Sequence, residues 1–482
     1  MHLGAVQRVL GLMLTLFGIT LAIPILVAWC YGDGALMPFV YGSAIVVGVG
    51  LIGWATAPHH HPDLRLRDGF LIVALIWTLC SLLGALPFWF AIRPDMNFTD
   101  AVFETVSGLT TTGATSLIGL DKLPHAILYY RSQLHWFGGM GIIILGLAVL
   151  PMLGVGGMQL YRAETPGPVK DKLTPRVTET AKALWLIYLG ITVACALSYW
   201  LAGMPLFDAI CNSFGTVATG GFSMHDASFA FYHSNGLELI GAFFMFMSGA
   251  NFALHYGVFR SGSIKTWLRD PEFRFYLGIT VLLVAVMTAD LYFRGVYPTV
   301  FKSFVESSFQ YTSMMTTTGF LSADFTVWPG FIPMMLIFIG FMGACVGSTA
   351  GGLKVVRIHL MAKQALREVQ RLVHPTAEIP VKSGKSVVSN RVLQGVLGFV
   401  ATYFALFAIM MMILLATGMK PLEAFSGLAT CMNNVGPGLG SVAFTFAGVH
   451  GVAKWTLTIA MLLGRLEIYP LLILFTPAFW RR

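Results

Sequence analysis

Four short stretches built from threonine, asparagine and glycine recur along the chain and are suited to binding a cation. The first is Thr110-Thr111-Thr112-Gly113, and the third, Thr316-Thr317-Thr318-Gly319, nearly repeats it. The second is Ala218-Thr219-Gly220, and the fourth and most divergent is Asn433-Asn434-Val435-Gly436. Glycine adopts positive φ without steric cost and can turn neighbouring carbonyls toward a common axis. A ring of carbonyls replaces the hydration shell of a monovalent cation, and threonine hydroxyls can add ligands or brace the loop.

The composition places these stretches in a membrane protein. The chain is 56% hydrophobic and 11% charged, with a mean hydropathy of +0.75, whereas soluble domains average about 25% charged residues. Runs of about 20 apolar residues recur, the length that crosses a bilayer. The net charge of +8 does not indicate nucleic-acid binding, because the basic residues collect in alternate loops rather than on one soluble domain. The cysteines are scattered without a Cys-x-x-Cys pair, so we expect no metal cluster and no disulfide framework.

The glycines of successive stretches lie about 100 residues apart, which suits a unit of two membrane helices joined by a loop. Each unit reads as a span, a short helix, the glycine-bearing loop and a second span. We therefore predict an all-α polytopic membrane protein with four span–pore-helix–span repeats around one central ion pathway, about ten spans and four re-entrant pore loops. The predicted short helices cover 98–109, 206–217, 299–314 and 421–432, and continuous second spans are expected at 128–153, 236–259 and 453–479. The predicted units are an N-terminal transmembrane hairpin (1–68) and repeats at 69–182, 183–274, 275–391 and 392–482.

A structural alternative is that the glycines only permit tight turns between helices. If the chain contained a single loop of this kind, we would favour that interpretation. Four loops at matching places favour a shared path, since irregular backbone at membrane depth is tolerated only where it is buried in protein or lines a water-filled cavity. The predicted cation-binding residues are Thr111, Thr112, Gly113, Thr219, Gly220, Thr317, Thr318, Gly319, Asn434, Val435 and Gly436.

Lysine and arginine placement predicts the orientation. Basic residues gather in the loops after the first three repeats and at the C-terminus: Arg162, Lys170, Lys172, Arg176, Lys182, Arg260, Lys265, Arg269, Arg274, Lys354, Arg357, Lys363, Arg367, Arg371, Lys382, Lys385, Arg391, Arg481 and Arg482. The opposite side is acidic: Asp33, Asp95, Asp100, Glu104, Asp121, Asp208, Asp226, Glu306, Asp324 and Glu423. We expect both termini and the basic loops in the cytoplasm, and the glycine loops entering from outside.

A second glycine-rich segment, 343–352, interrupts the apolar run that begins near Pro329. Glycine costs about 1 kcal/mol relative to alanine inside a helix, so several together should unwind the span. Close packing of helices through small residues is the alternative. The functional interpretation is a flexible segment beneath the loops that obstructs the path and moves, with Gly343, Gly347, Ser348, Thr349, Gly351 and Gly352 as its gating residues.

Arg465 lies near the middle of the apolar run 453–479. A charge at that depth is costly and marks a functional residue unless it is paired for structure alone. Glu467 is two residues away, so the two side chains do not face each other on a helix. We expect Arg465 to point to the path or to the broken helix as a gating residue, and Lys354 to anchor at the membrane interface.

With these motifs in this order, the chain resembles the potassium transporter superfamily that includes the Trk, Ktr and HKT proteins, over essentially its whole length. Thr110–Gly113, Gly347–Gly352 and Gly464-Arg465-Leu466-Glu467-Ile468 most resemble the bacterial TrkH/TrkG branch. The resemblance implies that Gly113, Gly220, Gly319 and Gly436 contribute to a selectivity filter. Glycine rather than serine at the first position implies preference for potassium over sodium, and the fourth loop departs from the Thr-Gly pattern.

The resemblance implies more than the filter. It implies an intramembrane gating loop at 343–352 and a pore-side Arg465 that limits cation flow. It also implies a homodimer in the bacterial inner membrane, regulated by a cytoplasmic nucleotide-binding subunit of the TrkA type. K⁺, or Rb⁺ in its place, would be the permeant ion, and this chain would need no cofactor of its own.

The predicted function is therefore potassium uptake through a selective, gated, channel-like pore. A proton- or sodium-coupled potassium symporter is the alternative, although such carriers often use inverted repeats and here the repeats run in one direction. A membrane-embedded enzyme is disfavoured because the sequence contains no catalytic constellation, and a purely structural scaffold would leave the four loops and Arg465 without a role.

Overall fold

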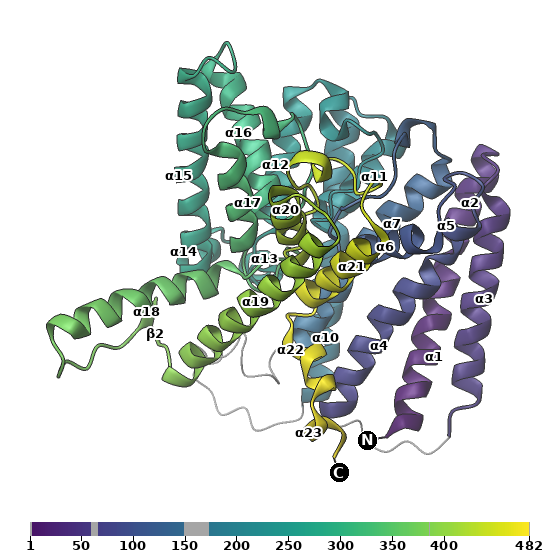
Figure 1. Ribbon diagram of the computed structural model, residues 1–482, viewed down its shortest axis with the longest axis horizontal. Coiled ribbons are helices and arrows are strands. Elements are labelled where there is room, and N and C mark those ends of the chain that lie inside the picture. The colour runs from purple at the N-terminus through teal and green to yellow at the C-terminus, as the bar shows by residue number, and fades with distance from the viewer. Residues whose placement is uncertain (1, 59–65, 149–172, 385, 482) are drawn as a thin grey trace.

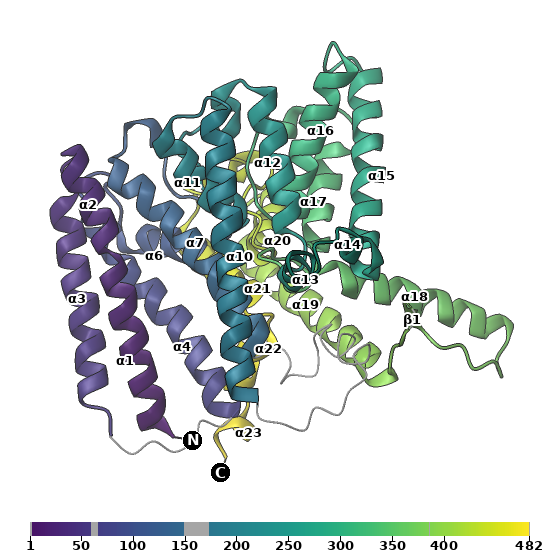
Figure 2. The same cartoon turned by 180° about the vertical axis from the view of Figure 1, so that it is seen from behind.

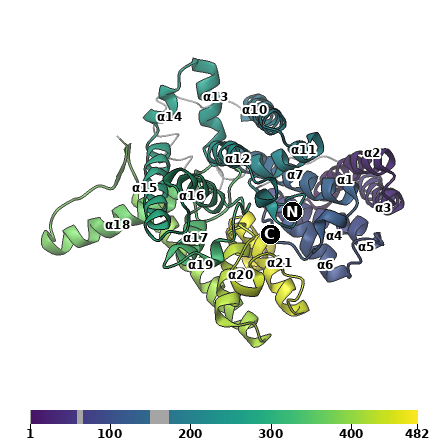
Figure 3. The same ribbon diagram turned by 90° about the horizontal axis from the view of Figure 1, so that it is seen from above.

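The computed structural model describes residues 2–58, 66–148, 173–384 and 386–481. Its long elements are all helices, which stand side by side and surround a common centre (Figures 1, 2 and 3). The predicted basic residues Arg162, Lys170, Lys172, Lys385 and Arg482, and the end of the span predicted at 128–153, lie outside the described residues.

Six helices or helix pairs are long and apolar enough to cross a membrane, or eight if each sharply bent pair counts as one span. This confirms a multi-span membrane protein. The unbent spans are α1 (Leu3–Thr20) with α2 (Ala22–Tyr31), α3 (Leu36–Ala55), α4 (Leu66–Gly84) with α5 (Leu86–Phe90), α10 (Leu173–Leu201), α15 (Pro271–Phe293) and α19 (Asn390–Ala416). Outside these spans are α7 (His125–Ala148), a helix of 24 residues, and the shorter apolar helix α17 (Ile332–Met342).

Four short helices occupy the centre of the molecule, as predicted: α6 (Phe98–Leu109), α11 (Leu206–Val217), α16 (Val300–Met315) and α20 (Pro421–Met432). Side-chain hydrogen bonds cap the N-termini of two of them. Asn97 accepts a hydrogen bond from the backbone N–H of Asp100 at 2.9 Å, and Thr299 accepts one from Lys302 at 3.2 Å, the usual N-cap contacts. From the second turn onward most of their residues are buried, whereas apolar residues near their starts, such as Phe98, Leu206, Val300 and Leu422, are exposed. None of the four is long enough to cross a bilayer.

Two predicted continuous spans are instead sharply bent. The span predicted at 236–259 divides into α12 (Asn235–Ser248) and α13 (Phe252–Ser261), bent by 94°. The span predicted at 453–479 divides into α21 (Gly451–Arg465) and α22 (Tyr469–Leu472) with a following 3₁₀ turn (Ile473–Phe475), bent by 110°. Tertiary contacts explain the first break: the N–H of Cys345 donates to the carbonyl of Gly249, and the N–H of Phe252 donates to that of Gly347, both at 3.0 Å. At the second, Glu467 and Ile468 take positive φ (55° and 59°), which ends the helix.

The third repeat is broken as predicted. The helix α17 ends at Met342, and the chain resumes as α18 (Val355–Val373), which projects sideways from the body (Figure 1). A small antiparallel hairpin of β1 (Lys382–Ser383) and β2 (Ser386–Val387) follows, a minor departure from the predicted all-α fold. The remaining short helices are α14 (Lys265–Arg269), α23 (Pro477–Trp480) and 3₁₀ turns at Leu120–Lys122, Ser228–Tyr232, Phe325–Val327 and Gly440–Val442. Both chain ends lie together at the bottom of the view in Figure 1, below the level at which α18 projects.

Candidate functional site

The four short helices end in the same way, and each continues directly into one of the predicted loops. In each loop a backbone N–H reaches five residues back, to a carbonyl in the last turns of the helix. The pairs are Thr112 to Ser107 and Gly220 to Gly215 at 2.8 Å, and Thr318 to Ser313 and Val435 to Thr430 at 2.7 Å. This six-to-one closure is that of a Schellman motif. These hydrogen bonds therefore establish which residues of the four loops correspond to one another. They do so also for the fourth loop, whose sequence diverges most from the others.

The residue before each of these donors has a left-handed backbone. Thr111, Thr219, Thr317 and Asn434 have φ of 52°, 53°, 56° and 57°. Three of them are β-branched threonines, for which this conformation costs roughly 1–3 kcal/mol and persists only where the surroundings impose it. The same left-handed backbone at four matching positions, strained at three of them, points to a functional constraint on the loops.

A second positive φ follows two residues later, always at a glycine: Gly113 (79°), Gly221 (85°), Gly319 (81°) and Gly436 (98°). A Cβ added to Gly113 would lie 2.2 Å from the carbonyl oxygen of Gly220, and one on Gly221 would lie 2.0 Å from that of Thr318. The corresponding distances are 1.9 Å from Gly319 to the Val435 oxygen and 2.7 Å from Gly436 to the Thr112 oxygen. Each loop thus abuts the next, and the fourth returns to the first, which closes a ring.

The register predicted for the second loop is wrong by one residue. Gly220 does not have positive φ, and its counterparts by hydrogen bonding are Thr112, Thr318 and Val435. The glycine that matches Gly113 is Gly221, which the prediction omitted. The adjacent Gly-Gly pair made the choice ambiguous. A count of four residues from the end of each short helix would have identified Gly221 from the sequence.

The ring contains buried carbonyl groups that lack partners. The residues just before the ring glycines, Thr112, Gly220, Thr318 and Val435, are buried, and within the described residues none of their carbonyl oxygens accepts a hydrogen bond. More than 90% of buried backbone polar groups in proteins are paired. Four unpaired carbonyls in one ring can instead serve a dehydrated cation. The C-terminal ends of the four short helices also carry partial negative charge that favours a cation nearby.

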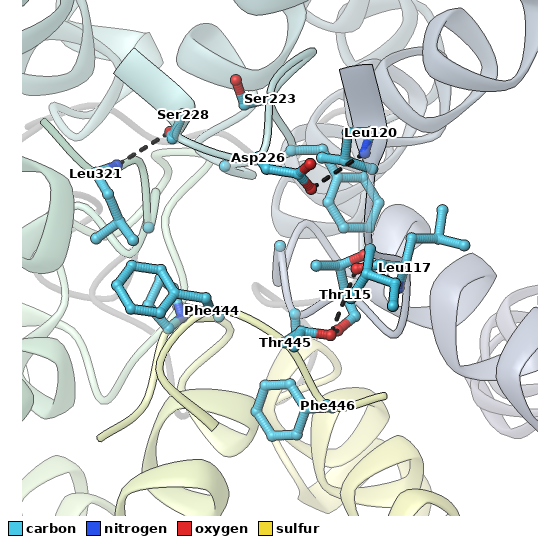
Figure 4. A pocket seen from close by; sticks show the side chains of 18 of the residues that line it. Thr115, Leu117, Leu120, Ser223, Asp226, Ser228, Leu321, Phe444, Thr445 and Phe446 are labelled. Atoms are coloured by element: carbon cyan, nitrogen blue, oxygen red, sulfur yellow. Dashed lines mark hydrogen bonds between the residues drawn. The ribbon is translucent and has the colours of Figure 1, made fainter. Parts of the chain in front are cut away.

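A cavity of about 130 Å³ opens on one side of the ring, and all four ring glycines line it. Figure 4 shows its wall, where the N–H of Leu120 donates to Asp226 and that of Leu321 donates to Ser228. These bonds tie the segment after the second loop to those after the first and third. None of the residues that line the cavity belongs to the 343–352 segment.

A buried ion pair supports this wall. Arg131 donates from Nε to Glu104 at 2.8 Å and from a terminal nitrogen to the Ser223 carbonyl at 3.0 Å. Glu104 also accepts from the N–H of Ser116 at 2.9 Å. Arg131 and Glu104 are 1% and 0% exposed, so a charge left alone here would be costly. Arg131 was not predicted, although an arginine inside an apolar helix is a signal of the kind that singled out Arg465.

The 343–352 segment lies against the other side of the ring. Its hydrogen bonds reach three loops. The N–H of Gly351 donates to the hydroxyl of Thr317 at 2.6 Å, the N–H of Gly352 donates to the carbonyl of Asn433 at 3.1 Å, and Thr219 and Thr349 hydroxyls lie 3.2 Å apart. Gly343 ends α17 with φ of 66°, and Gly347 has φ of 76°. The segment is therefore unwound, as predicted, and packed directly beneath the loops.

Arg465 connects this segment to the first repeat. It is 2% exposed and ends α21, rather than lying within a continuous span. One guanidinium nitrogen donates to the carbonyl of Thr349 at 2.8 Å, and the other donates to that of Gly138 on α7 at 3.0 Å. The side chain thus points toward the broken helix, one of the two directions predicted.

The prediction that Lys354 anchors at the membrane interface is wrong. Its side chain is 6% exposed, and its ammonium donates to the carbonyl of Ala350 within the segment. Arg357, at the start of α18, forms an ion pair with Glu467 and stacks 4.2 Å above the ring of Phe399. Glu467 is therefore paired with another helix and not with Arg465.

A family model described as TrkH, cation transport protein, matches residues 36–482. The chain is 50% identical over 482 residues to the Trk system potassium uptake protein TrkH of Salmonella typhimurium, covering 100% of both chains. It is 40% identical over 481 residues to TrkG of Escherichia coli, covering 100% of this chain and 99% of the relative. The crystal structure of the potassium transporter TrkH from Vibrio parahaemolyticus matches with a TM-score of 0.94 and 48% identity, covering 100% of each chain.

Proposed function

Because this chain belongs to the TrkH family of cation transport proteins, we propose that it takes up potassium through a path enclosed by its four loops. The family is one of transport proteins, so the prediction that the chain is not an enzyme is confirmed. In this proposal α7 and α17 join the eight other spans to give ten crossings, and the four loops are re-entrant. The proposed repeats are 69–182, 183–274, 275–391 and 392–482, after an N-terminal hairpin at 1–68.

The ring of unpaired carbonyls is the observation that carries the proposal. The oxygens of Thr112, Gly220, Thr318 and Val435 are buried and accept no hydrogen bond within the described residues. A K⁺ ion that sheds its water needs such ligands. The ring glycines Gly113, Gly221, Gly319 and Gly436 let the loops approach closely enough to supply them, since any Cβ would collide with the next loop.

The segment 343–352 is the proposed gate. It lies directly beneath the ring and is held by Thr317, Asn433 and Arg465, so ions could pass only after it moves. Its gating residues remain those proposed from the sequence: Gly343, Gly347, Ser348, Thr349, Gly351, Gly352 and Arg465.

The cellular setting is proposed from the family and from the charge distribution. Both termini, α18 and the basic loops would face the cytoplasm of a bacterial cell, and the 130 Å³ cavity would face outward. The membrane subunit would form a homodimer and bind a cytoplasmic nucleotide-binding subunit of the TrkA type, which would move the gate. The basic surface of 353–391 is the proposed docking region.

Purified protein in liposomes is expected to take up Rb⁺ passively, in competition with K⁺ and in preference to Na⁺. The Gly113→Ser variant should weaken that preference, because its Cβ would lie 2.2 Å from the Gly220 oxygen and displace it. Uptake is measured with and without an imposed proton or sodium gradient, and with and without the regulatory subunit. Uptake that requires a gradient would instead favour the symporter, and no uptake even with the partner subunit would contradict the proposal.

The Thr317→Val variant is expected to raise basal Rb⁺ flux roughly two- to tenfold. It removes the hydroxyl that accepts from Gly351, a neutral hydrogen bond worth about 0.5–1.5 kcal/mol, and so favours the displaced gate. Thr111→Val makes the same change at the matching position, where the hydroxyl has no partner within the described residues. The flux of Thr317→Val relative to Thr111→Val measures the lost bond, and equal fluxes would show that it does not hold the gate.

A further inference from the structure

His225 lies between two carboxylates beside the cavity. Its Nδ1 is 2.5 Å from Asp121 Oδ1, on the segment after the first loop, and its Nε2 is 3.2 Å from Asp208 Oδ2, on α11. The ring stacks on Phe231 with centroids 3.5 Å apart. His225 itself follows the second loop by a few residues and lines the same cavity as Gly221. The imidazole therefore connects the first and second repeats at the mouth of the ring.

The geometry favours the charged imidazole. An ionised carboxylate only accepts hydrogen bonds, and a neutral imidazole has one donor and one acceptor nitrogen. Both nitrogens of His225 face carboxylate oxygens, so only the imidazolium can donate to both. Loss of the proton breaks one contact and leaves two carboxylates without their cation.

Charged and titratable groups from several elements surround His225. Burial lowers the pKa of His225, but hydrogen bonds and charge from Asp208 and Asp121 outweigh burial and raise the pKa above its ordinary value of 6.5. Partial burial raises the pKa of Asp121, but His225 outweighs this effect and lowers it. Burial, followed by the charge of Asp208, raises the pKa of Tyr232, which donates to Asp208. Asp226, which accepts from Leu120, and Arg131, which lies on α7, are the other charged groups among the described residues that line the cavity.

The same acidic position recurs on all four short helices, ten residues before the residue that caps the helix: Asp100, Asp208, Glu306 and Glu423. Lys454 pairs with Asp100 and Lys302 pairs with Glu306 at 2.7 Å, while Glu423 accepts from the N–H of Ser441 at 3.3 Å. Lysine and arginine stay charged near neutral pH, and histidine does not. Among the contacts of the described residues, Asp208 is therefore the one member of this set whose cationic partner is a histidine.

We propose that His225 is a positioning residue that makes cation entry depend on the pH at the outer mouth, through its reversible bridge between Asp121 and Asp208. At a pH below that at which His225 loses its proton, the bridge is closed, and His225, Asp121 and Asp208 together carry a net charge of −1. Above it they carry −2, and the local concentration of K⁺ rises. The inference rests on the proposed function, because the mouth matters only if ions pass through the ring.

The pH at the outer mouth is expected to change the apparent affinity for the transported cation. One added negative charge about 8–10 Å from an entering ion, in water, raises occupancy roughly twofold at low ionic strength, and by less at 0.1 M salt because of screening. The KM for Rb⁺ should therefore fall by up to that factor as pH rises through the transition of His225, which lies above 6.5. The maximal rate should change little, since the ring carbonyls are untouched.

The test compares fixed-charge variants in proteoliposomes, with equal pH on both faces so that no proton gradient contributes. His225→Arg keeps the positive charge and should hold the KM at its low-pH value at every pH. His225→Gln is always neutral and should hold it at the high-pH value. His233→Gln, in the same segment but exposed, should keep the wild-type profile. A His225→Gln protein with the wild-type pH dependence would overturn the proposal, as would a wild-type KM that does not change with pH.

A second measurement does not depend on transport. The imidazole signals of isotope-labelled protein are followed by NMR as pH rises, and the His225→Gln variant assigns the signal. A midpoint above 6.5 that drops in Asp121→Asn supports the bridge, and a midpoint at or below 6.5 overturns it. Failure of Rb⁺ uptake in the wild type would count against the proposed function, whereas this titration decides the bridge separately.

Discussion

The Gly221→Ala variant is expected to lose most of its discrimination between Rb⁺ and Na⁺, by about tenfold or more. The new Cβ would lie 2.0 Å from the carbonyl oxygen of Thr318, a distance at which that oxygen must move. The opposing atom belongs to backbone already held by the Ser313 hydrogen bond at 2.7 Å, so the strain cannot be relieved by rotating a side chain. Because cation selectivity depends on the number and placement of carbonyls, a displaced member should admit Na⁺. The measurement is the ratio of Rb⁺ to Na⁺ uptake in proteoliposomes.

A matched control separates ring geometry from backbone strain. Gly119 has a similar φ of 71° and nothing within 4 Å of its added Cβ, so Gly119→Ala carries the conformational cost of roughly 1–2 kcal/mol without the collision. Its selectivity should equal that of the wild type. If Gly221→Ala remains selective while Gly113→Ser does not, Gly221 is not the counterpart of Gly113, and the register taken from the hydrogen bonds is wrong.

Local sequence was sufficient to predict the short helices. The helices α6, α11 and α20 have the bounds that were predicted from apolar periodicity and the loop residues that follow. Propensity and capping act within a few residues, so a single sequence contains what is needed. The same holds for the unwound segment at 343–352, whose glycines are sufficient to end α17.

Features that depend on contacts between distant segments could not be predicted in the same way. The bend after Ser248 is held by hydrogen bonds from Cys345 and Phe252 across the fold. The local signals, Gly249 and the Asn251 side chain that caps α13, are not sufficient by themselves to predict a break in an apolar run. Lys354 looked like an interfacial residue by position alone, yet it is buried against the segment that precedes it. The pairing of Arg131 with Glu104, and of His225 with Asp121, likewise joins segments that the sequence could not place together.

Replacing Arg465 by alanine is expected to raise basal cation flux about tenfold to a hundredfold. The guanidinium donates to Thr349 in the proposed gate and to Gly138 on α7, at 2.8 and 3.0 Å. Hydrogen bonds to charged groups are worth about 1.5–3 kcal/mol each, and each 1.4 kcal/mol changes an equilibrium tenfold. Loss of the link to Thr349 therefore shifts the segment toward its displaced state, and loss of the positive charge removes a repulsion on the passing ion. Rb⁺ flux without the regulatory subunit is the measurement.

Arg465→Lys distinguishes the two contributions. Lysine keeps the charge but has a single ammonium, which cannot reproduce the forked contact with two carbonyls that arginine makes. If the repulsion of the charge limits flow, Arg465→Lys should have wild-type flux. If the link between Thr349 and Gly138 holds the gate, its flux should lie well above wild type and approach that of Arg465→Ala. The link predicts the second result, because Arg465 is 2% exposed and both terminal nitrogens are used in bonds across the path. Basal flux of Arg465→Ala at or below the wild-type value, in protein that elutes as a single folded species, would show that Arg465 does not restrain the gate.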